Sequence, residues 1–353
     1  MDNNNLFLNY SERNKNFLYV WEANQIMFQK NEEEIMKDWN CKERFEPVVS
    51  IKCLAYNHEK SISKCIEGFL MQETTFPFEI IIHDDASKDT TADIIRKYES
   101  KYPNIIKPIY QTENQYSKHN GVIRKMVNSK LNGKYVAFCE GDDCWTEPYK
   151  LQMQVDYLEK HPECSMTYHA VNYVKDGIVL RNDQYFNCET DVKPDLIIEK
   201  GGMFCSTLSL CVRKDVYLEY PNFRLMSDVG DYPLQILASL RGVIHYFPEI
   251  MGEYQHQSSG SWSEKMKKNN DRLCRHFIKE IEWMKELDCF TDYKYTESIY
   301  FHLINYSVFG LYLSKNIDYS EVKEYMSKLK LRSNKLKCYK NLLKLRIKKV
   351  LKK

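Results

Sequence analysis

Long apolar runs are missing from this sequence. No stretch of 18 or more consecutive apolar residues occurs in its 353 residues, whereas a helix needs about 20 such residues to cross the hydrocarbon core of a bilayer. The polar opening, MDNNNLFLNYSERNKN, lacks the basic start and apolar centre of a signal peptide. We therefore expect no spanning helix and a cytoplasmic chain.

Two kinds of short motif are also absent. The sequence has no glycine-rich phosphate loop, neither G-x-x-x-x-G-K-[ST] nor G-x-G-x-x-G. None of its twelve cysteines forms a C-x-x-C pair, and Cys53, Cys139 and Cys211 lie within apolar runs. We interpret the cysteines as buried free thiols rather than as a disulfide or zinc framework.

The charge of the chain is unevenly distributed. The net charge is only +2, but residues 334–353 carry nine Lys or Arg and no acid. The remaining residues therefore carry 42 basic and 49 acidic side chains, a net charge of −7. Because this larger part is acidic and shows no interleaved aromatic and basic residues on a sheet, we do not expect nucleic acid binding.

Strand-like and helix-like segments alternate after a polar N-terminal extension. We expect a helical extension over residues 1–46, a sheet domain over 47–263 and a helical region over 264–353. The first strand-like runs are continuously apolar, which is typical of a mostly parallel sheet with helices on both faces. The expected strands and helices of this α/β domain alternate as 48–56, 61–72, 78–85, 90–103, 104–111, 121–131 and 134–143.

Acidic residues directly follow two of these strands. Asp84 and Asp85 end the run FEIIIHDD, and Glu140, Asp142 and Asp143 end the run KYVAFCEGDD. Ligands of parallel sheets bind beyond the carboxyl ends of the strands, so the two clusters can share one crevice. Carboxylate oxygens suit Mg²⁺ or Mn²⁺ together with a phosphorylated ligand. The alternative is that these acids only cap the following turns and helices.

The order and spacing of three motifs resemble the inverting family 2 glycosyltransferases of the GT-A fold. The first strand ends in YN at 56–57, the second in DDASKDT at 84–90, and GKYVAFCEGDD at 133–143 matches the metal motif of that family. The resemblance runs from Val49 to about Ser263. It implies a GT-A domain, Rossmann-like and flanked by helices, that transfers a sugar from a nucleotide-diphosphate sugar.

The resemblance also implies donor-binding residues. Asp85 would accept the imide N–H of the nucleobase, which favours a UDP-sugar. Tyr56 would lie near the base, Arg124 would contact the diphosphate, and Asp142 would bind the metal or the ribose. Two alternatives remain open: Tyr56 as a core aromatic at a strand end, and Arg124 as a solvated residue on a helix face.

The implied cofactor is Mn²⁺ or Mg²⁺. Asp143 and Asp142 match the metal and ribose positions of the family, and Glu140 and His256 are further candidate ligands. Glu140 stands where the family has Asp, so a contact through water is an alternative to direct coordination. His256 arrives one residue early in the family's Y-R-x-H pattern, where Gln255 replaces the Arg.

The acceptor side of the site requires a base. An inverting transfer needs a group that deprotonates the attacking hydroxyl, and MSDVGDYPLQILASLRG offers Asp231 first and Asp228 as second choice. Asp231 could instead be the N-cap of the helix that contains Pro233. Ser206 and Thr207 lie where the family has small hydroxyl residues, and Trp262 lies in a serine-rich stretch that suits a lid or plain packing.

The basic C-terminal segment reads as an amphipathic helix. Helices of this type lie on anionic membrane surfaces, which would bring the protein to the inner face of a membrane. The alternative is a helix that packs on the domain with its basic face in solvent. The apolar residues at helical spacing are Leu336, Tyr339, Leu343, Ile347 and Val350.

Taken together, these motifs predict a metal-dependent inverting glycosyltransferase. Its partners would be a nucleotide-diphosphate sugar and a glycan or lipid-linked acceptor of surface polysaccharide or glycoconjugate synthesis. Two other classes stay open: a nucleotidyltransferase acting on a sugar phosphate, and a non-catalytic scaffold that binds nucleotide.

Overall fold

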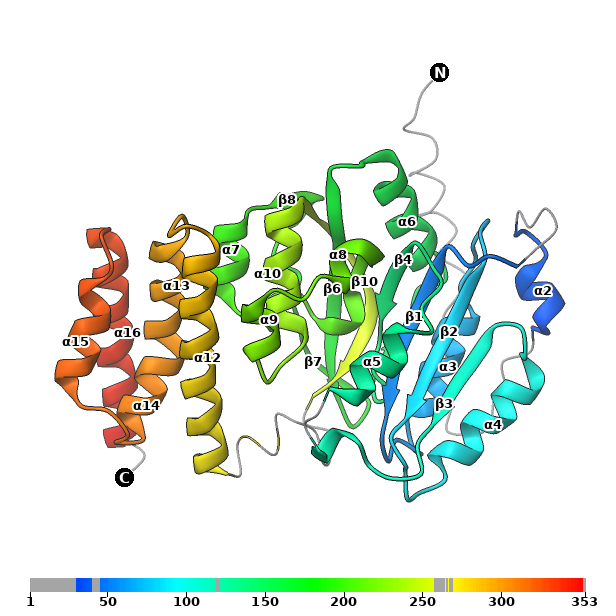
Figure 1. Cartoon of the computed structure of the whole chain (residues 1–353), viewed down its shortest axis with the longest axis horizontal. Coiled ribbons are helices and arrows are strands. Elements are labelled where there is room, and N and C mark those ends of the chain that lie inside the picture. Colours follow the sequence, from blue (N-terminus) through cyan, green and yellow to red (C-terminus); the bar gives the residue numbers. More distant parts are fainter. Residues whose placement is uncertain are drawn as a thin grey trace. The chain divides into compact units, whose positions relative to one another are not determined.

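The computed structural model of the chain describes residues 30–39, 45–118, 121–256, 264, 266 and 269–351. Residues 31–353 form one compact unit, whose elements Figure 1 shows in chain order. The domain boundaries expected after residues 46 and 263 stay predictions. The helical pattern expected before residue 30 lies outside the described residues.

Ten strands of the described residues form one sheet, in the order β3-β2-β1-β4-β9-β6-β10-β5, with β7 beside β6 and β8 beside β10. Neighbours within β3-β2-β1-β4 run parallel, whereas β9 runs antiparallel to β4 and β6. The α/β fold class is confirmed, and the parallel order extends over the first four strands before the sheet becomes mixed. The strands are β1 Val49–Ala55, β2 Phe78–Asp84, β3 Ile106–Tyr110, β4 Tyr135–Phe138, β5 Cys144–Trp145, β6 Cys164–Lys175, β7 Ile178–Asn182, β8 Thr190–Val192, β9 Cys211–Arg213 and β10 Val243–Gln255.

Helices cover the sheet and continue beyond it (Figure 1). Those between the strands are α2 Glu32–Met36, α3 Ile62–Leu70, α4 Thr91–Lys101, α5 Val122–Asn128, α6 Lys150–Lys160, α7 Pro194–Lys200, α8 Lys214–Leu218, α9 Asn222–Met226 and α10 Asp231–Arg241, with 3-10 turns η2 Tyr116–Lys118 and η3 Thr207–Ser209. The C-terminal region contains α12 Asn270–Phe290, α13 Thr296–Leu303, the π-helical η4 Ile304–Val308, α14 Phe309–Leu313, α15 Tyr319–Ser327 and α16 Arg332–Leu351. The predicted helical C-terminal region is thus confirmed for its described residues.

Local sequence explains most of these elements. Every residue of β2 is buried, as its continuous apolar run predicts. The hairpin of β6 and β7 turns at Asp176 and Gly177, whose φ angles of 50° and 77° suit a two-residue turn. Helix α6 begins at Lys150 with Tyr149 as its N-cap, so Pro148 precedes the helix.

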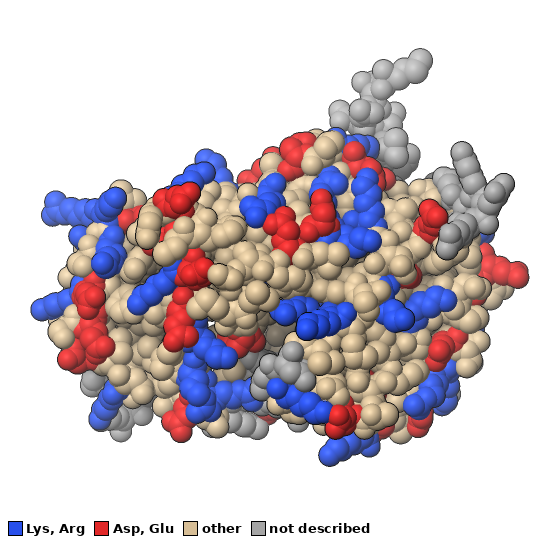
Figure 2. All heavy atoms as spheres, in the orientation of Figure 1, with Lys and Arg blue, Asp and Glu red and all other residues tan. Residues whose placement is uncertain are grey.

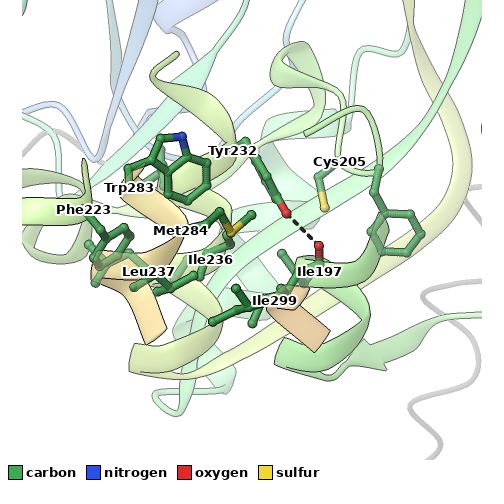
Figure 3. Packing of buried hydrophobic residues seen from close by; sticks show 14 of the residues in the cluster. Ile197, Cys205, Phe223, Tyr232, Ile236, Leu237, Trp283, Met284 and Ile299 are labelled. Carbon is green, nitrogen blue, oxygen red and sulfur yellow. Dashed lines mark hydrogen bonds between the residues drawn. The ribbon is translucent and has the colours of Figure 1, made fainter. Parts of the chain in front are cut away.

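The C-terminal helices share a hydrophobic core with the sheet domain. Trp283 of α12 is fully buried, and its ring packs edge-on against Tyr232 of α10, with ring centroids 5.5 Å apart. The Tyr232 hydroxyl donates to the carbonyl of Ile198 at 2.6 Å. Figure 3 shows Met284 of α12 and Leu237 of α10 packed in the same cluster. The position of α10 therefore depends on the C-terminal region.

The basic tail forms helix α16. Cys338 and Leu342 are buried, whereas Leu336, Tyr339 and Leu343 are exposed. On the face that Figure 2 shows, Lys and Arg of the C-terminal helices are interspersed with Asp and Glu. The helix thus packs on the domain through Cys338 and Leu342. The apolar stripe expected from the sequence faces solvent over its described part. The side chains of residues 347 and 350 lie outside that part.

No helix among the described residues is long and apolar enough to span a bilayer.

Substitution of Trp283 tests the shared core. We expect Trp283→Ala to lower the free energy of unfolding by about 3–5 kcal/mol, because it removes a large buried side chain and leaves a cavity. Ile278→Ala on the same helix is the control, since Ile278 is 46% exposed and a surface change costs about 0.5 kcal/mol or less. Urea denaturation followed by circular dichroism measures both. Equal losses in the two variants would contradict a core shared through α12.

Candidate active site

The loops that follow β1 and β2 are tied to each other. Asn57 adopts a positive φ of 57°, and its Oδ1 accepts the backbone N–H of Lys88 at 2.8 Å. Its own N–H donates to Ser87 Oγ at 2.9 Å. The N–H of His58 donates to Thr91 Oγ1 at 2.8 Å. Part of the YN and DDASKDT motifs therefore serves to fix the two loops against each other at the sheet edge.

The two acids at the end of β2 are both buried. Asp84 Oδ2 accepts the N–H of Ser87 at 3.2 Å, while its Oδ1 has no hydrogen-bond partner among the described residues. Asp85 accepts the backbone N–H of Gln115 at 2.8 Å and of Tyr116 at 2.9 Å, one on each carboxylate oxygen. Asp85 thus positions the segment after β3, a role that its place in the motif did not reveal.

The acidic motif, residues 140–143, continues directly from β4 along β1. The N–H of Gly141 donates to the carbonyl of Leu54 at 2.9 Å. A Cβ on Gly141 would lie 2.7 Å from His58 Nδ1 and 3.1 Å from Ile62 Cδ1. A larger residue at this position would require His58 to shift, so close packing favours glycine here.

Asp143 is buried and bonded to the backbone. Its Oδ1 accepts the N–H of Gln255 at 2.8 Å, which ties the end of β10 to the motif. Burial and the charge of Asp142 raise the pKa of Asp143 well above its usual value. Asp142, by contrast, is half-buried. The backbone of β10 therefore holds Asp143, and Asp142 is the more exposed of the two side chains.

Glu140 lies among three other charged side chains, Asp142, Asp231 and Lys52. Glu140 is exposed at the surface. Desolvation by the surrounding protein and the negative charges of Asp142 and Asp231 nevertheless raise its pKa to about 7. Lys52 acts in the opposite direction. Asp231 stands about ninety residues further along the chain, so the fold brings carboxylates from β4 and α10 into one site.

Asp231 is held by two donors at the start of α10. The N-cap of this helix is Gly230, so the expectation that Asp231 could be the N-cap is wrong: it is the first helical residue. Thr207 Oγ1 donates to its Oδ2 at 2.9 Å, and the N–H of Tyr232 donates to its Oδ1 at 2.8 Å. The half-buried carboxylate is therefore oriented, and the first turn of a helix accommodates its negative charge.

Asp228 is engaged by the C-terminal region. Both of its oxygens lie 3.0 Å from Nδ1 of His276 on α12. Burial lowers the pKa of His276, but Asp228, with smaller contributions from Glu280 and Asp231, outweighs burial and raises the pKa above its ordinary value. The second-choice base is thus an ion-pair partner, which makes it less available than Asp231.

The other expected residues lie around this site. Tyr56 is half-buried directly after β1. The guanidinium of Arg124 on α5 stacks over the ring of Tyr220, 4.5 Å from its centroid. The ring of His256 lies 6.2 Å from that of Tyr173. Their proposed contacts with donor or metal stay predictions.

The acceptor-side residues are only partly described. Ser206 donates to the buried Asp183 at 2.9 Å, so it belongs to an internal polar network, whereas Thr207 contacts the candidate base. Trp262 lies outside the described residues, as does most of the serine-rich stretch around it.

Lys52 and Arg224 were not among the expected site residues, and we call these two residues together with Tyr217 the basic cluster. Lys52 of β1 donates to the Tyr217 hydroxyl at 3.0 Å, and Arg224 lies near the same ring. The signal in the sequence was a lysine inside the apolar run VVSIKCLAY, since a charged residue in a buried strand needs a specific partner.

The described residues contain no group of three or more His, Cys, Asp or Glu side chains that could hold a metal ion by themselves. Any cation at the acidic motif would therefore take part of its ligands from a bound molecule or from water, as Mg²⁺ commonly does.

Titration of Glu140 tests the crowding of carboxylates. In metal-free buffer, we expect its pKa to fall in Asp142→Asn and, by a smaller amount, in Asp231→Asn, because each change removes a nearby negative charge. Asp215→Asn, an exposed position on α8, is the control and should leave the pKa unchanged. NMR of the labelled glutamate side-chain carboxyl, assigned with Glu140→Gln, measures the shift. A pKa that is insensitive to Asp231→Asn would separate α10 from the site.

Known proteins share both the sequence pattern and the fold. The sequence model of the family described as glycosyl transferase family 2 matches residues 50–217. The putative teichuronic acid biosynthesis glycosyltransferase TuaG of Bacillus subtilis is 27% identical over 253 residues, which are 70% of this chain and 95% of TuaG. The UDP-Glc:alpha-D-GlcNAc-diphosphoundecaprenol beta-1,3-glucosyltransferase WfaP of Escherichia coli is 27% identical over 61% of this chain and 80% of its own length.

One further sequence relative and one solved structure show how much of the chain is shared with known proteins. The chain is 34% identical to an uncharacterized protein of Mycobacterium tuberculosis and spans 60% of that protein's length. The crystal structure of S. aureus TarS residues 1–349 with UDP-GlcNAc has a TM-score of 0.53, at 16% identity and 79% coverage of each chain, which supports the GT-A fold. Residues 50–217 of this chain therefore belong to glycosyl transferase family 2.

Proposed function

We propose that the chain is a metal-dependent inverting glycosyltransferase that uses a UDP-sugar. The proposal rests on one observation. Asp142, which follows β4, and Asp231, at the start of α10, both lie close enough to Glu140 for their charges to raise its pKa. Glu140 and Asp142 suit a cation at the diphosphate end of a donor, and Asp231 suits the hydroxyl of an acceptor. The printed names of TuaG and WfaP, both glycosyltransferases, support this class of reaction.

The donor base would lie between Tyr56 and Asp85. An ionised carboxylate offers about four lone-pair sites, so Asp85 can accept the imide N–H of uracil in addition to the N–H groups of Gln115 and Tyr116. A uracil bound there would sit against the segment that Asp85 already orders. The UDP-Glc in the name of WfaP supports a uridine donor.

The acidic motif fits a divalent cation. Burial raises the pKa of Glu140, and the charges of Asp142 and Asp231 raise it further. A bound cation would relieve the part of this shift that comes from repulsion. Asp142 is the ligand we prefer, with Glu140 as a contact through water. Asp143 would position the motif through Gln255, and His256 is a further candidate ligand. When bound, the cation would neutralise charge on the diphosphate leaving group.

Asp231 would act as the base. The acceptor hydroxyl would pass its proton to a carboxylate oxygen of Asp231 while the hydroxyl oxygen bonds to the anomeric carbon. The bond from that carbon to the nucleoside diphosphate would break on the opposite face, which inverts the configuration. Thr207 and the N–H of Tyr232 would keep the carboxylate directed at the acceptor.

The acceptor would be a glycan or a lipid-linked glycan of surface polysaccharide synthesis. The teichuronic acid in the name of TuaG and the diphosphoundecaprenol in the name of WfaP support this class. Helix α16 exposes Leu336, Tyr339 and Leu343 between its lysines, so contact with an anionic membrane that carries such an acceptor stays a prediction.

Substitution of the base separates chemistry from binding. We expect Asp231→Asn to lower kcat by about 10²–10⁴-fold, the usual contribution of a positioned base, while the Kd of the UDP-sugar stays within about threefold. Asp228→Asn should lower kcat far less, because Asp228 pairs with His276. Release of UDP in steady state and calorimetric donor binding measure the two effects. Full turnover in Asp231→Asn, with loss in Asp228→Asn, would reassign the base.

A further inference from the structure

Helix α12 carries two titratable residues, His276 and Glu280, on the side that packs against the sheet domain. The helix runs beside α9 and α10 (Figure 1), and it lies outside residues 50–217, the part of the chain that the family model matches. The two residues stand four positions apart, so they share one face of the helix. The contacts of this face are therefore features of the chain that the family match does not cover.

His276 forms an ion pair with the loop before α10. Its Nδ1 lies 3.0 Å from both carboxylate oxygens of Asp228, and the two side chains are only 12% and 24% exposed. Burial raises the pKa of Tyr116 on η2, with Arg272 of α12 acting against this and Asp228 adding to it, so Tyr116 and Arg272 belong to the surroundings of the pair. Salt screens such a largely covered pair less than a surface pair, and the pair ties α12 to the loop three residues before the candidate base.

Two further carboxylates act on His276. Glu280 comes from the same helix, and Asp231 begins α10. Burial lowers the pKa of His276, but Asp228, with smaller contributions from Glu280 and Asp231, outweighs burial and raises it. The imidazole therefore favours its charged form and supplies a positive charge among the carboxylates on the acceptor side.

Glu280 is fixed from its other side by the C-terminal helices. His302 Nε2 lies 3.2 Å from its Oε1, and Ser307, in the π-helical turn η4, donates to its Oε2. Burial raises the pKa of Glu280, but the hydrogen bonds and charge of His302, the hydrogen bond of Ser307 and the charge of His276 together lower it. The negative charge beside His276 is thus held in place by the buried core of this region.

We propose that His276 is a positioning residue for the transfer, because its imidazolium pairs with Asp228 and leaves Asp231 as the acceptor-side carboxylate that takes the proton. This role rests on the proposed function, in which Asp231 is the base. A carboxylate without a counter-charge disfavours the ionised form of a neighbouring carboxylate. Without His276, the charge of Asp228 would therefore act on Asp231, which would become ionised only at higher pH. His276 thus sets the pH range of the transfer without touching a substrate.

The pH dependence of kcat tests this role, measured as release of UDP from the UDP-sugar that the parent hydrolyses fastest. We expect the acid limb to move to higher pH by about one unit in His276→Gln, since a nearby charge shifts the titration of a carboxylate by about 1–3 units. In the double variant His276→Gln/Asp228→Asn, the limb should return toward that of the parent, because the uncompensated charge is gone. Arg275→Gln, at an exposed position next to His276, is the control for loss of a positive charge and should leave the limb in place.

The position of the acid limb separates this role from a purely structural one. Thermal melting shows whether each variant is folded, and a loss of folded protein lowers kcat at every pH without moving the limb. An unmoved limb in His276→Gln, or a limb that moves as far in the double variant, would overturn the proposal alone. A parent that hydrolyses no UDP-sugar would instead overturn the proposed function, and the role of His276 with it.

NMR titration of the histidine rings provides a second measurement, which needs neither turnover nor a folded His276 variant. We expect the pKa of His276 to fall in Asp228→Asn, because this change removes the carboxylate charge 3.0 Å from Nδ1. A pKa of His276 that is the same in the parent and in Asp228→Asn would contradict the charged pair and overturn the proposal.

Discussion

The repulsion between carboxylates at one edge of the sheet is the constraint on which the rest of the site depends. Glu140 and Asp142 follow β4, and Asp231 begins α10 far along the chain. Burial raises the pKa of Glu140, and the charges of both neighbours raise it further. Such an arrangement persists only if the surrounding structure holds the groups in place. The edge is held by the hydrogen bond from the N–H of Gly141 to the carbonyl of Leu54 and by the hydrogen bond from the N–H of Gln255 in β10 to Asp143.

The helical C-terminal region completes this support from the other side. Helix α12 buries Trp283 against Tyr232, the residue next to Asp231, and it also supplies His276 to Asp228. The same helix therefore packs the core behind α10 and contributes a charged side chain close to the site. A substitution in α12 can thus change the position of the candidate base without touching any substrate.

Sequence patterns were sufficient for the architecture and for the positions of the motifs. Continuous apolar runs indicated β1, β2 and β4, and acids placed directly after strands indicated the sheet edge, because parallel strands end on one side. They were not sufficient for the partners of individual side chains. The two backbone N–H groups on Asp85 and the pairing of Asp228 with His276 join segments far apart in the chain, so no local pattern reports them.

The basic cluster illustrates the same limit. Lys52 is a charge within an apolar strand and Arg224 is an ordinary residue of a short helix, and neither was among the expected site residues. Their proximity depends on how α9 and α5 pack on the sheet, which is a tertiary property. Pattern and position therefore indicated the acidic motif, whereas the contacts of Lys52 and Arg224 with Tyr217 are visible only in three dimensions.

The central claim is that the acidic motif and the loops after β1 and β2 form a metal-assisted site for a uridine nucleotide. The most direct measurement is calorimetric titration of the full chain with UDP, with and without Mn²⁺, in the parent protein and in Asp142→Ala. The account predicts that Mn²⁺ strengthens UDP binding in the parent and that this effect disappears in the variant. UDP binding that is equally strong without metal, or a gain with Mn²⁺ that persists in Asp142→Ala, would contradict it.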